Sequence, residues 1–314
     1  MSNDPRPDPA DPLSDPFDAV LPAPSRQADT PVVMATVVEP IAPPKPRLRW
    51  QIPLLLFVAT CATTYDRGGP VYAGALMTIL LCHEFGHYLQ ARRHGVRASL
   101  PFFLPMPFSI IGTMGAVIGM DARVKDRRAL FDIGISGPLA GLVPTLVFCC
   151  VGLQAPYSEV KVPDGSFTQI GEPLVFHLIA DLIHGPLPPG QDIVIGPLAW
   201  AGWVGLLITA INLFPIGQLD GGHILYALLR RRAHLVAKAI LFLAVAGIAA
   251  AVMVFGQPQM AGWSVMILLL LIMGPAHPPT ARDDVPLGRG RIILGWLTLA
   301  FLIFAFTPNP LPGD

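Results

Sequence analysis

The stretch that most constrains this chain is residues 83–87, which read H-E-F-G-H inside an apolar run. The preceding residues 71–82 carry no charge. Four positions are slightly more than one helical turn, so His83 and His87 project from one helix face and can share one metal ion. Glu84 lies about 100° around the axis, where it can take a proton from water. Because ionisable groups at membrane depth cost about 2.5–3.5 kcal/mol each, a metal site is favoured over two chance histidines.

Composition predicts an integral membrane protein. The 314-residue chain is 53% hydrophobic and only 13% charged, whereas soluble domains carry about 25% charged residues. The formal net charge is zero, which disfavours nucleic acid as a partner. The four cysteines all fall in apolar segments, at spacings that predict neither a disulfide framework nor a cysteine-based zinc site.

The chain is expected to have three parts. Residues 1–46 are rich in proline and poor in large apolar residues, so we expect a disordered tail on the cytoplasmic side. This tail has no early apolar segment of the kind found in signal peptides. Residues 47–307 are expected to form the integral membrane domain, and residues 308–314 a short tail.

The apolar segments predict an all-α polytopic membrane protein with about seven transmembrane helices. Residues 98–120 are also uncharged, but prolines and glycines interrupt them. We therefore expect a re-entrant loop or short hairpin beside the metal there, and a kinked span is the alternative. A separate helical run, 220–229, is expected after the fourth span. The expected spans are 50–64, 71–93, 130–153, 198–213, 236–255, 263–273 and 292–306.

The distribution of lysine and arginine predicts the orientation of the spans. Basic residues gather before the first and third spans, after the second and fourth, and between residues 282 and 291. The connections 65–70, 154–195 and 256–262 carry almost none. Seven alternating spans then place the N-terminus and the metal site toward the cytoplasm and the C-terminus outside. Asp132, just inside the third span, is interpreted as a helix cap or a partner of an arginine.

Two histidines leave a zinc ion short of ligands, since a catalytic site needs a third protein ligand and one open position. Asp220 is the best candidate, because residues 212–223 are the other polar cluster in an apolar context and lie at the same side of the membrane. His223 competes as the ligand and otherwise has a supporting or structural role. Asn212 is expected to hold the substrate backbone or a developing oxyanion, and capping a broken helix is the equal alternative.

These motifs resemble the signatures of the site-2 protease family of intramembrane zinc metalloproteases. The matching patterns are H-E-x-x-H at 83–87 and N-x-x-P-x-x-x-x-D-G at 212–221. Residues 127–138 also resemble the subgroup found in cyanobacteria, chloroplasts and many other bacteria, without a PDZ-like or CBS domain. The resemblance covers residues 50–307. It implies one zinc ion per chain, held by His83, His87 and Asp220, with Glu84 as general base.

The resemblance also implies a function. We expect hydrolysis of peptide bonds in or near transmembrane segments of membrane proteins, as in regulated intramembrane proteolysis. The partners would be single-pass membrane anchors and the lipid bilayer, and the location a bacterial cytoplasmic membrane. Two alternatives stay open. A metal-ion transporter would need polar groups along several spans, and the later spans have few. A catalytically silent zinc-binding scaffold is disfavoured by the intact Glu84.

Overall fold

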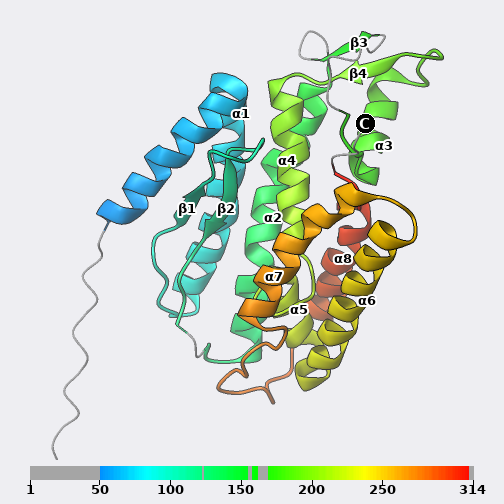
Figure 1. Cartoon of the computed structure of the whole chain (residues 1–314). Helices are drawn as coiled ribbons and strands as arrows, with labels where there is room; N and C mark the ends of the chain where they lie inside the picture. Colours follow the sequence, from blue (N-terminus) through cyan, green and yellow to red (C-terminus); the bar gives the residue numbers. More distant parts are fainter. Residues whose placement is uncertain (1–49, 122–123, 155–157, 162–168, 311–314) are drawn as a thin grey trace, which may run out of the picture. The chain divides into compact units, whose positions relative to one another are not determined.

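The computed structural model describes residues 50–121, 124–154, 158–161 and 169–310. The described part is mostly helical, which confirms the helical class predicted from the sequence (Figure 1). All of it belongs to one compact unit, which covers residues 48–314. The tail predicted for residues 1–46 lies outside the described residues.

Helix α1 (Gln51–Arg93) contains the first two expected spans, joined by a break instead of a loop. At this break Gly69 has φ 72° and ψ −172°, a backbone conformation that glycine adopts without steric cost. Pro70 follows it and lacks an N–H donor. Figure 1 shows the two limbs of α1 as a bent pair, in blue and cyan. The second limb carries the H-E-F-G-H stretch.

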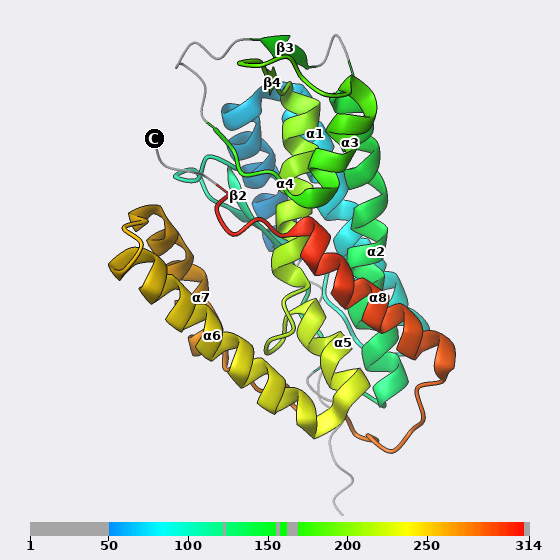
Figure 2. The same cartoon turned by 90° about the vertical axis from the view of Figure 1, so that its right-hand side faces the viewer.

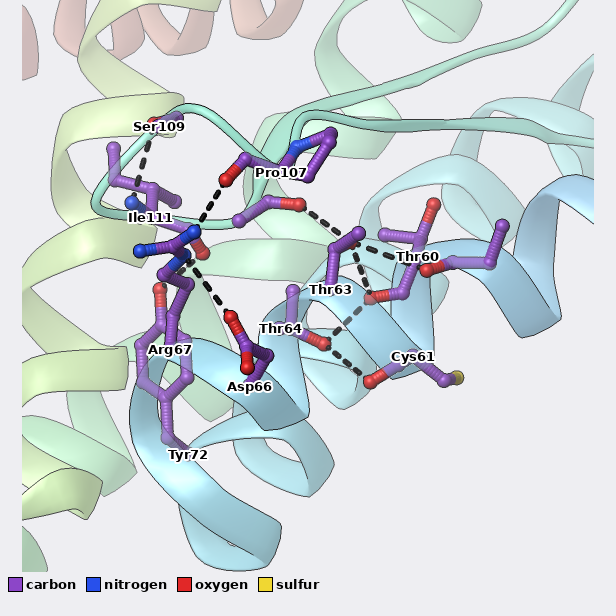
Figure 3. Close-up of polar contacts among 12 residues, drawn as sticks. Thr60, Cys61, Thr63, Thr64, Asp66, Arg67, Tyr72, Pro107, Ser109 and Ile111 are labelled. Carbon is purple, nitrogen blue, oxygen red and sulfur yellow. Dashed lines mark hydrogen bonds and ion pairs between the residues drawn. The ribbon is translucent and has the colours of Figure 1, made fainter.

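The proline- and glycine-rich stretch forms a hairpin, as expected, instead of a kinked span. Strand β1 (Phe102–Pro105) pairs antiparallel with β2 (Thr113–Val117). Three side chains of α1 hold the connecting loop (Figure 3). The Thr63 hydroxyl donates to the carbonyl of Gly112 at 2.7 Å, and the Tyr72 hydroxyl to that of Ile111 at 2.8 Å. Arg67 donates to the carbonyl of Pro107. The hairpin is therefore tied to both sides of the α1 break.

The central packing is formed by the second limb of α1, α2 (Arg127–Gly152) and α4 (Pro197–Asn212). Asp126 caps α2, because its carboxylate accepts the Ala129 N–H at 2.9 Å. Small residues let the helices approach closely: a Cβ at Gly202 would lie 2.7 Å from the Cys149 sulfur. Large side chains from α1 and α4 fill the space between them and are fully buried: Tyr72, Leu76, Trp203, Val204 and Leu206.

The connection between α2 and α4 contains little regular secondary structure. Strand β3 (Glu159–Lys161) pairs antiparallel with β4 (Asp192–Val194), and α3 (Leu174–His184) lies between them in sequence. The apolar side of α3 packs on the core through Phe176 and Ala180, as expected for an amphipathic helix.

The C-terminal third is again helical (Figure 2). Its elements are α5 (Asp220–Leu229), η1 (Arg230–Arg232), α6 (Ala233–Met253), η2 (Pro258–Trp263), α7 (Ser264–Met273) and α8 (Arg289–Ala305). Leu241 of α6 and Leu270 of α7 share a small apolar cluster with Ile216, which precedes α5. The connection 274–288 returns from α7 to α8 past α5 and the start of α2.

Two helical segments of the described residues are long and apolar enough to cross a membrane, by length and composition: Arg127–Gly152 and Asp220–Met253. Three further apolar stretches are shorter: Leu174–His184, Pro197–Asn212 and Pro258–Met273. The prediction of seven transmembrane helices is therefore not confirmed. For the shorter stretches the physical reason is length, since a helix needs about 20 apolar residues to cross a bilayer alone. Helix α1 has 43 residues, but its second limb carries His83, Glu84 and His87.

Candidate metal centre

Two imidazoles and one carboxylate meet in the interior. Nε2 of His83 lies 3.1 Å from Oδ2 of Asp220, and Nε2 of His87 lies 3.2 Å from Oδ1 of the same residue. The two Nε2 atoms are 3.2 Å apart. The side chain of His83 is 5% exposed and that of Asp220 is 12% exposed, and the candidate ligand atoms of all three residues lie within 4.8 Å of one another. Two neutral imidazoles, one carboxylate and an open fourth position are a donor set that suits catalytic zinc.

The three residues come from distant parts of the chain. His83 and His87 lie one helical turn apart on the second limb of α1, whereas Asp220 is the first residue of α5. His223, the competing candidate, does not belong to this group. Its Nδ1 instead lies 2.7 Å from Nε2 of His277. The structure thus brings Asp220, and not His223, to the histidine pair.

The histidine pair fits against α2 because glycines face it there. A Cβ at Gly137 would overlap Nε2 of His87, and one at Gly141 would lie 3.0 Å from Cβ of His83. The contact is reciprocal, since a Cβ at Gly86 would lie 2.5 Å from the carbonyl oxygen of Ser136. The four-residue spacing of Gly137 and Gly141 predicts close helix contact, and the structure shows what that contact holds.

We expect Gly137→Ala to lower zinc affinity about 10–100-fold, the range found when groups that orient a metal ligand are disturbed. The added methyl group would overlap the His87 ring, 2.0 Å from its Nε2, so the ring must turn away. Zinc per chain, measured by elemental analysis after competition with a chelator, checks this. Gly74→Ala is the control, because its added Cβ meets no atom within 4 Å. Full zinc content in Gly137→Ala would contradict the geometry.

A backbone contact orients His87. Its Nδ1 lies 2.8 Å from the carbonyl oxygen of Ile133 on α2. A carbonyl only accepts, so Nδ1 carries the proton and Nε2 keeps its lone pair. This is the tautomer that binds a metal through Nε2.

The loop between α4 and α5 aims Asp220 at the histidines. Gly221 and Gly222 let this loop pack against the first turn of α5. A Cβ at Gly221 would overlap the carbonyl oxygen of Leu213, and one at Gly222 would overlap that of Gly217. Gly217 itself has φ 57°, a conformation favourable to glycine. The glycines that follow Asp220 are therefore explained by packing.

Two further predicted residues lie close to this group. Glu84 is 4% exposed, and none of the described residues hydrogen-bonds its carboxylate. It is thus free to act on a water or substrate proton. Asn212 ends α4, and its Nδ2 lies 3.5 Å from Nε2 of His83. An amide there can contact the oxygen of a carbonyl bound beside the metal.

The arginine partner expected for Asp132 is Arg291. Its Nε lies 2.7 Å from Oδ1 and its Nη2 lies 2.8 Å from Oδ2, a two-point contact, while Nε2 of His94 lies 3.1 Å from Oδ2. Asp132 thereby ties α8 to α2 and to the end of α1. The interpretation of this aspartate as an arginine partner is confirmed.

Sequence reasoning missed His277, which contacts the turn of α5 that follows Asp220. Its ring stacks on Tyr226, with centroids 4.7 Å apart, and its Nε2 contacts His223. Burial lowers the pKa of His277 to about 4, so the ring is neutral at pH 7. The only sequence signal was a histidine in a connection, which usually indicates a solvated side chain.

A model of peptidase family M50 matches residues 71–255, which include all the candidate residues around the histidine pair and Asp220. The chain belongs to peptidase family M50. This membership confirms the predicted family and the predicted class of enzyme. No solved structure matches the chain.

Relatives of this M50 chain include three plant proteins. "Probable zinc metalloprotease EGY2, chloroplastic" of Oryza sativa subsp. indica is 32% identical over 77% of this chain and 43% of its own length. The Arabidopsis thaliana protein of the same name is 33% identical over 75% and 43%. "Probable zinc metalloprotease EGY1, chloroplastic" of Arabidopsis thaliana is 30% identical over 77% and 43%. The chain thus spans less than half the length of these relatives.

The comparison contradicts the prediction of a bacterial cytoplasmic membrane. The relatives named above are described as chloroplastic, not as proteins of a bacterial cytoplasmic membrane. The physical reason for the error is that lysine and arginine counts orient spans across a bilayer. They carry no information about which bilayer it is.

Proposed function

We propose that this protein is a zinc metalloendopeptidase that hydrolyses peptide bonds in or near transmembrane segments of membrane proteins. The observation that carries the proposal is the convergence of His83, His87 and Asp220 on one buried point beside Glu84. The names of the M50 relatives, which are zinc metalloproteases, agree with the donor set. We assign one zinc ion per chain.

The residues divide the work of hydrolysis. His83, His87 and Asp220 would hold the zinc ion, which when bound acidifies a water and polarises the scissile carbonyl. Glu84 takes the proton from the attacking water and delivers it to the leaving amine. The Asn212 amide orients the carbonyl of the substrate. The buried setting strengthens these electrostatic interactions because little water competes with them.

The outer surface of the helices supports a position within the bilayer. Helix α6 exposes five large apolar side chains, whereas exposed apolar residues on soluble proteins usually stand singly. They are Leu235, Phe242, Leu243, Val245 and Met253. We propose that residues 47–307 form the membrane domain with about seven spans, and that 1–46 and 308–314 flank it as tails. The metal centre would lie toward the side that carries the basic residues 230–232.

An extended substrate fits the hairpin better than a helical one. A membrane helix keeps its carbonyls in backbone hydrogen bonds, so the scissile carbonyl must first be released. β1 and β2 form a two-stranded sheet in the described residues, and an extended segment can add to its edge. We therefore propose single-pass anchors as substrates, with helix-weakening residues near the scissile bond.

Helix-weakening residues should then set the rate of cleavage. Glycine costs about 1 kcal/mol and proline about 3 kcal/mol in a helix interior. Replacing one or two of them by leucine in a model substrate should therefore slow cleavage by about tenfold or more, measured by gel shift in detergent and in liposomes. The control substrate replaces leucines outside the weakened region by alanine. Equal cleavage rates for the parent substrate and the substrate with leucine replacements would contradict the proposal.

One pair of assays separates the proposed protease from its alternatives. Purified protein should cleave a single-pass membrane substrate, whereas vesicles that contain it should take up no more zinc than empty ones. Zinc uptake without cleavage would favour a transporter. Bound zinc with neither activity would favour a silent scaffold.

A further inference from the structure

The connection between α7 and α8 reaches the candidate metal centre from outside it. Two of its residues contact the stretch 217–223, which carries Asp220 and is called the Asp220 arm below. The Gly217 N–H donates to the carbonyl of Pro275 at 3.2 Å, and His223 pairs with His277 through ring nitrogens 2.7 Å apart. Gly217 lies three residues before Asp220 and His223 three residues after it. The segment 274–277 therefore contacts the Asp220 arm on both sides of the ligand.

The hydrogen bonds of this pair have one direction. Nδ1 of His277 lies 2.5 Å from the carbonyl oxygen of Pro278, so this nitrogen is the donor. A neutral ring then offers Nε2 as an acceptor, and Nδ1 of His223 must donate to it. The neutral His223 is thereby fixed as the tautomer whose Nε2 carries the lone pair. The ring cannot flip without losing this contact.

The segment is itself held in place. The His277 ring stacks on Tyr226, and its carbonyl lies 3.0 Å from Nε2 of His234 on α6. Farther along, the Tyr226 hydroxyl donates to Asp283 at 2.7 Å. The Ala281 N–H donates to the carbonyl of Val124, just before α2, at 3.0 Å. The segment 274–277 is therefore held against α5 and α6, and the chain that continues from it is held at the approach to α2.

Close packing leaves the Asp220 arm little freedom of its own. A Cβ at Gly217 would lie 2.6 Å from the carbonyl oxygen of Gly274, and one at Gly134 on α2 would lie 2.8 Å from Cβ of His223. The arm is thus enclosed between α2 on one side and the segment 274–277 on the other. A shift of this segment would move Asp220 relative to the two histidines.

We propose that the segment Gly274–His277 is a brace that positions Asp220 for the metal, with His277 as its positioning residue. The proposal rests on the proposed metal centre and adds a residue that acts on the metal through His223 and α5. Groups that orient metal ligands typically contribute 10–100-fold in metal affinity. The expected effect of losing the His277 contact is of this size.

The test compares two replacements of similar size in the full-length protein. His277→Leu removes the acceptor for His223, whereas His277→Gln keeps an amide oxygen near the position of Nε2. Zinc affinity is measured by chelator competition. His277→Leu should bind zinc about 10–100-fold more weakly, and His277→Gln should stay within a few-fold of the parent. Cobalt in place of zinc should show an altered visible absorption in His277→Leu only.

His184→Leu is the matched control. This histidine also contacts a backbone carbonyl, that of Leu153 at 2.7 Å, but it lies at the end of α3, far in sequence from the metal residues. It should leave zinc affinity unchanged. If His277→Leu does not fold, His277→Asn replaces it, because the shorter amide falls short of the His223 nitrogen.

The outcomes separate the brace from the proposed function. A parent protein that binds no zinc contradicts the metal centre itself. A parent that binds zinc, with His277→Leu or His277→Asn binding it as tightly, contradicts the brace alone. Equal weakening by His277→Leu and His277→Gln would also overturn the brace, because packing and not the His223 contact would then be the cause.

Discussion

Glu84→Gln protein is expected to keep its zinc and to cleave membrane substrates about 10²–10⁴-fold more slowly than the parent. Glutamine preserves the size and polarity of the side chain but cannot accept a proton at pH 7. Glu84 is only 4% exposed, and no described residue hydrogen-bonds its carboxylate, which leaves the carboxylate available to a water or substrate proton. The zinc ligands are unchanged, so the metal content should stay at one per chain.

The measurement needs both quantities from the same preparation. Initial rates of cleavage of a single-pass substrate are compared with zinc content by elemental analysis. Glu172→Gln serves as the control. This exposed glutamate lies just before α3 and pairs with His177 on α3, away from the candidate residues. A Glu84→Gln protein that cleaves within tenfold of the parent would remove Glu84 from the role of base.

Asp220→Ala is expected to lose both zinc and cleavage. The substitution removes the carboxylate that lies 3.1 Å from His83 and 3.2 Å from His87, which leaves two imidazoles to hold the ion. Two ligands are fewer than the three protein ligands of catalytic zinc sites. We therefore expect zinc content after purification to fall from one per chain to near background, and cleavage to fall with it.

His223→Ala is the matched comparison on the same helix. His223 lies outside the group of candidate ligands, so this variant should retain most of its zinc on purification. A chelator should remove that zinc more readily than from the parent, since His223 links Asp220 to the brace. If His223→Ala were metal-free and Asp220→Ala were not, the third ligand would be His223.

The histidine pair can be located from sequence alone because its geometry is local. A spacing of four residues on a helix fixes the relative direction of two side chains whatever the rest of the chain does. Asp220 is harder, because sequence gives only its polarity within an apolar context and its side of the membrane. The structure adds the glycines that bring it to the histidines. The contacts between Asp220 and the two histidines join residues more than a hundred positions apart and leave no periodic signal in the sequence.

The expected elements also show where sequence reasoning stops. The prolines and glycines of residues 98–120 predict the hairpin, since they exclude a regular helix. The break at Gly69 is not predicted as such, because the same residues fit a short loop between two spans equally well. His277 could not be assigned, since its contacts depend on how the connection 274–288 returns past α5. Local chemistry is readable from sequence, whereas the path of an irregular segment is set by the packing around it.

The separation of the metal residues along the chain has a consequence for biosynthesis. His83 and Asp220 are 137 positions apart. At about 5–20 residues per second, the ribosome needs about 7–27 s to advance from the first to the second. If Asp220 is the third ligand, as we propose, His83 and His87 lack that ligand during this interval. The proposed metal centre would therefore be incomplete until α5 has been synthesised.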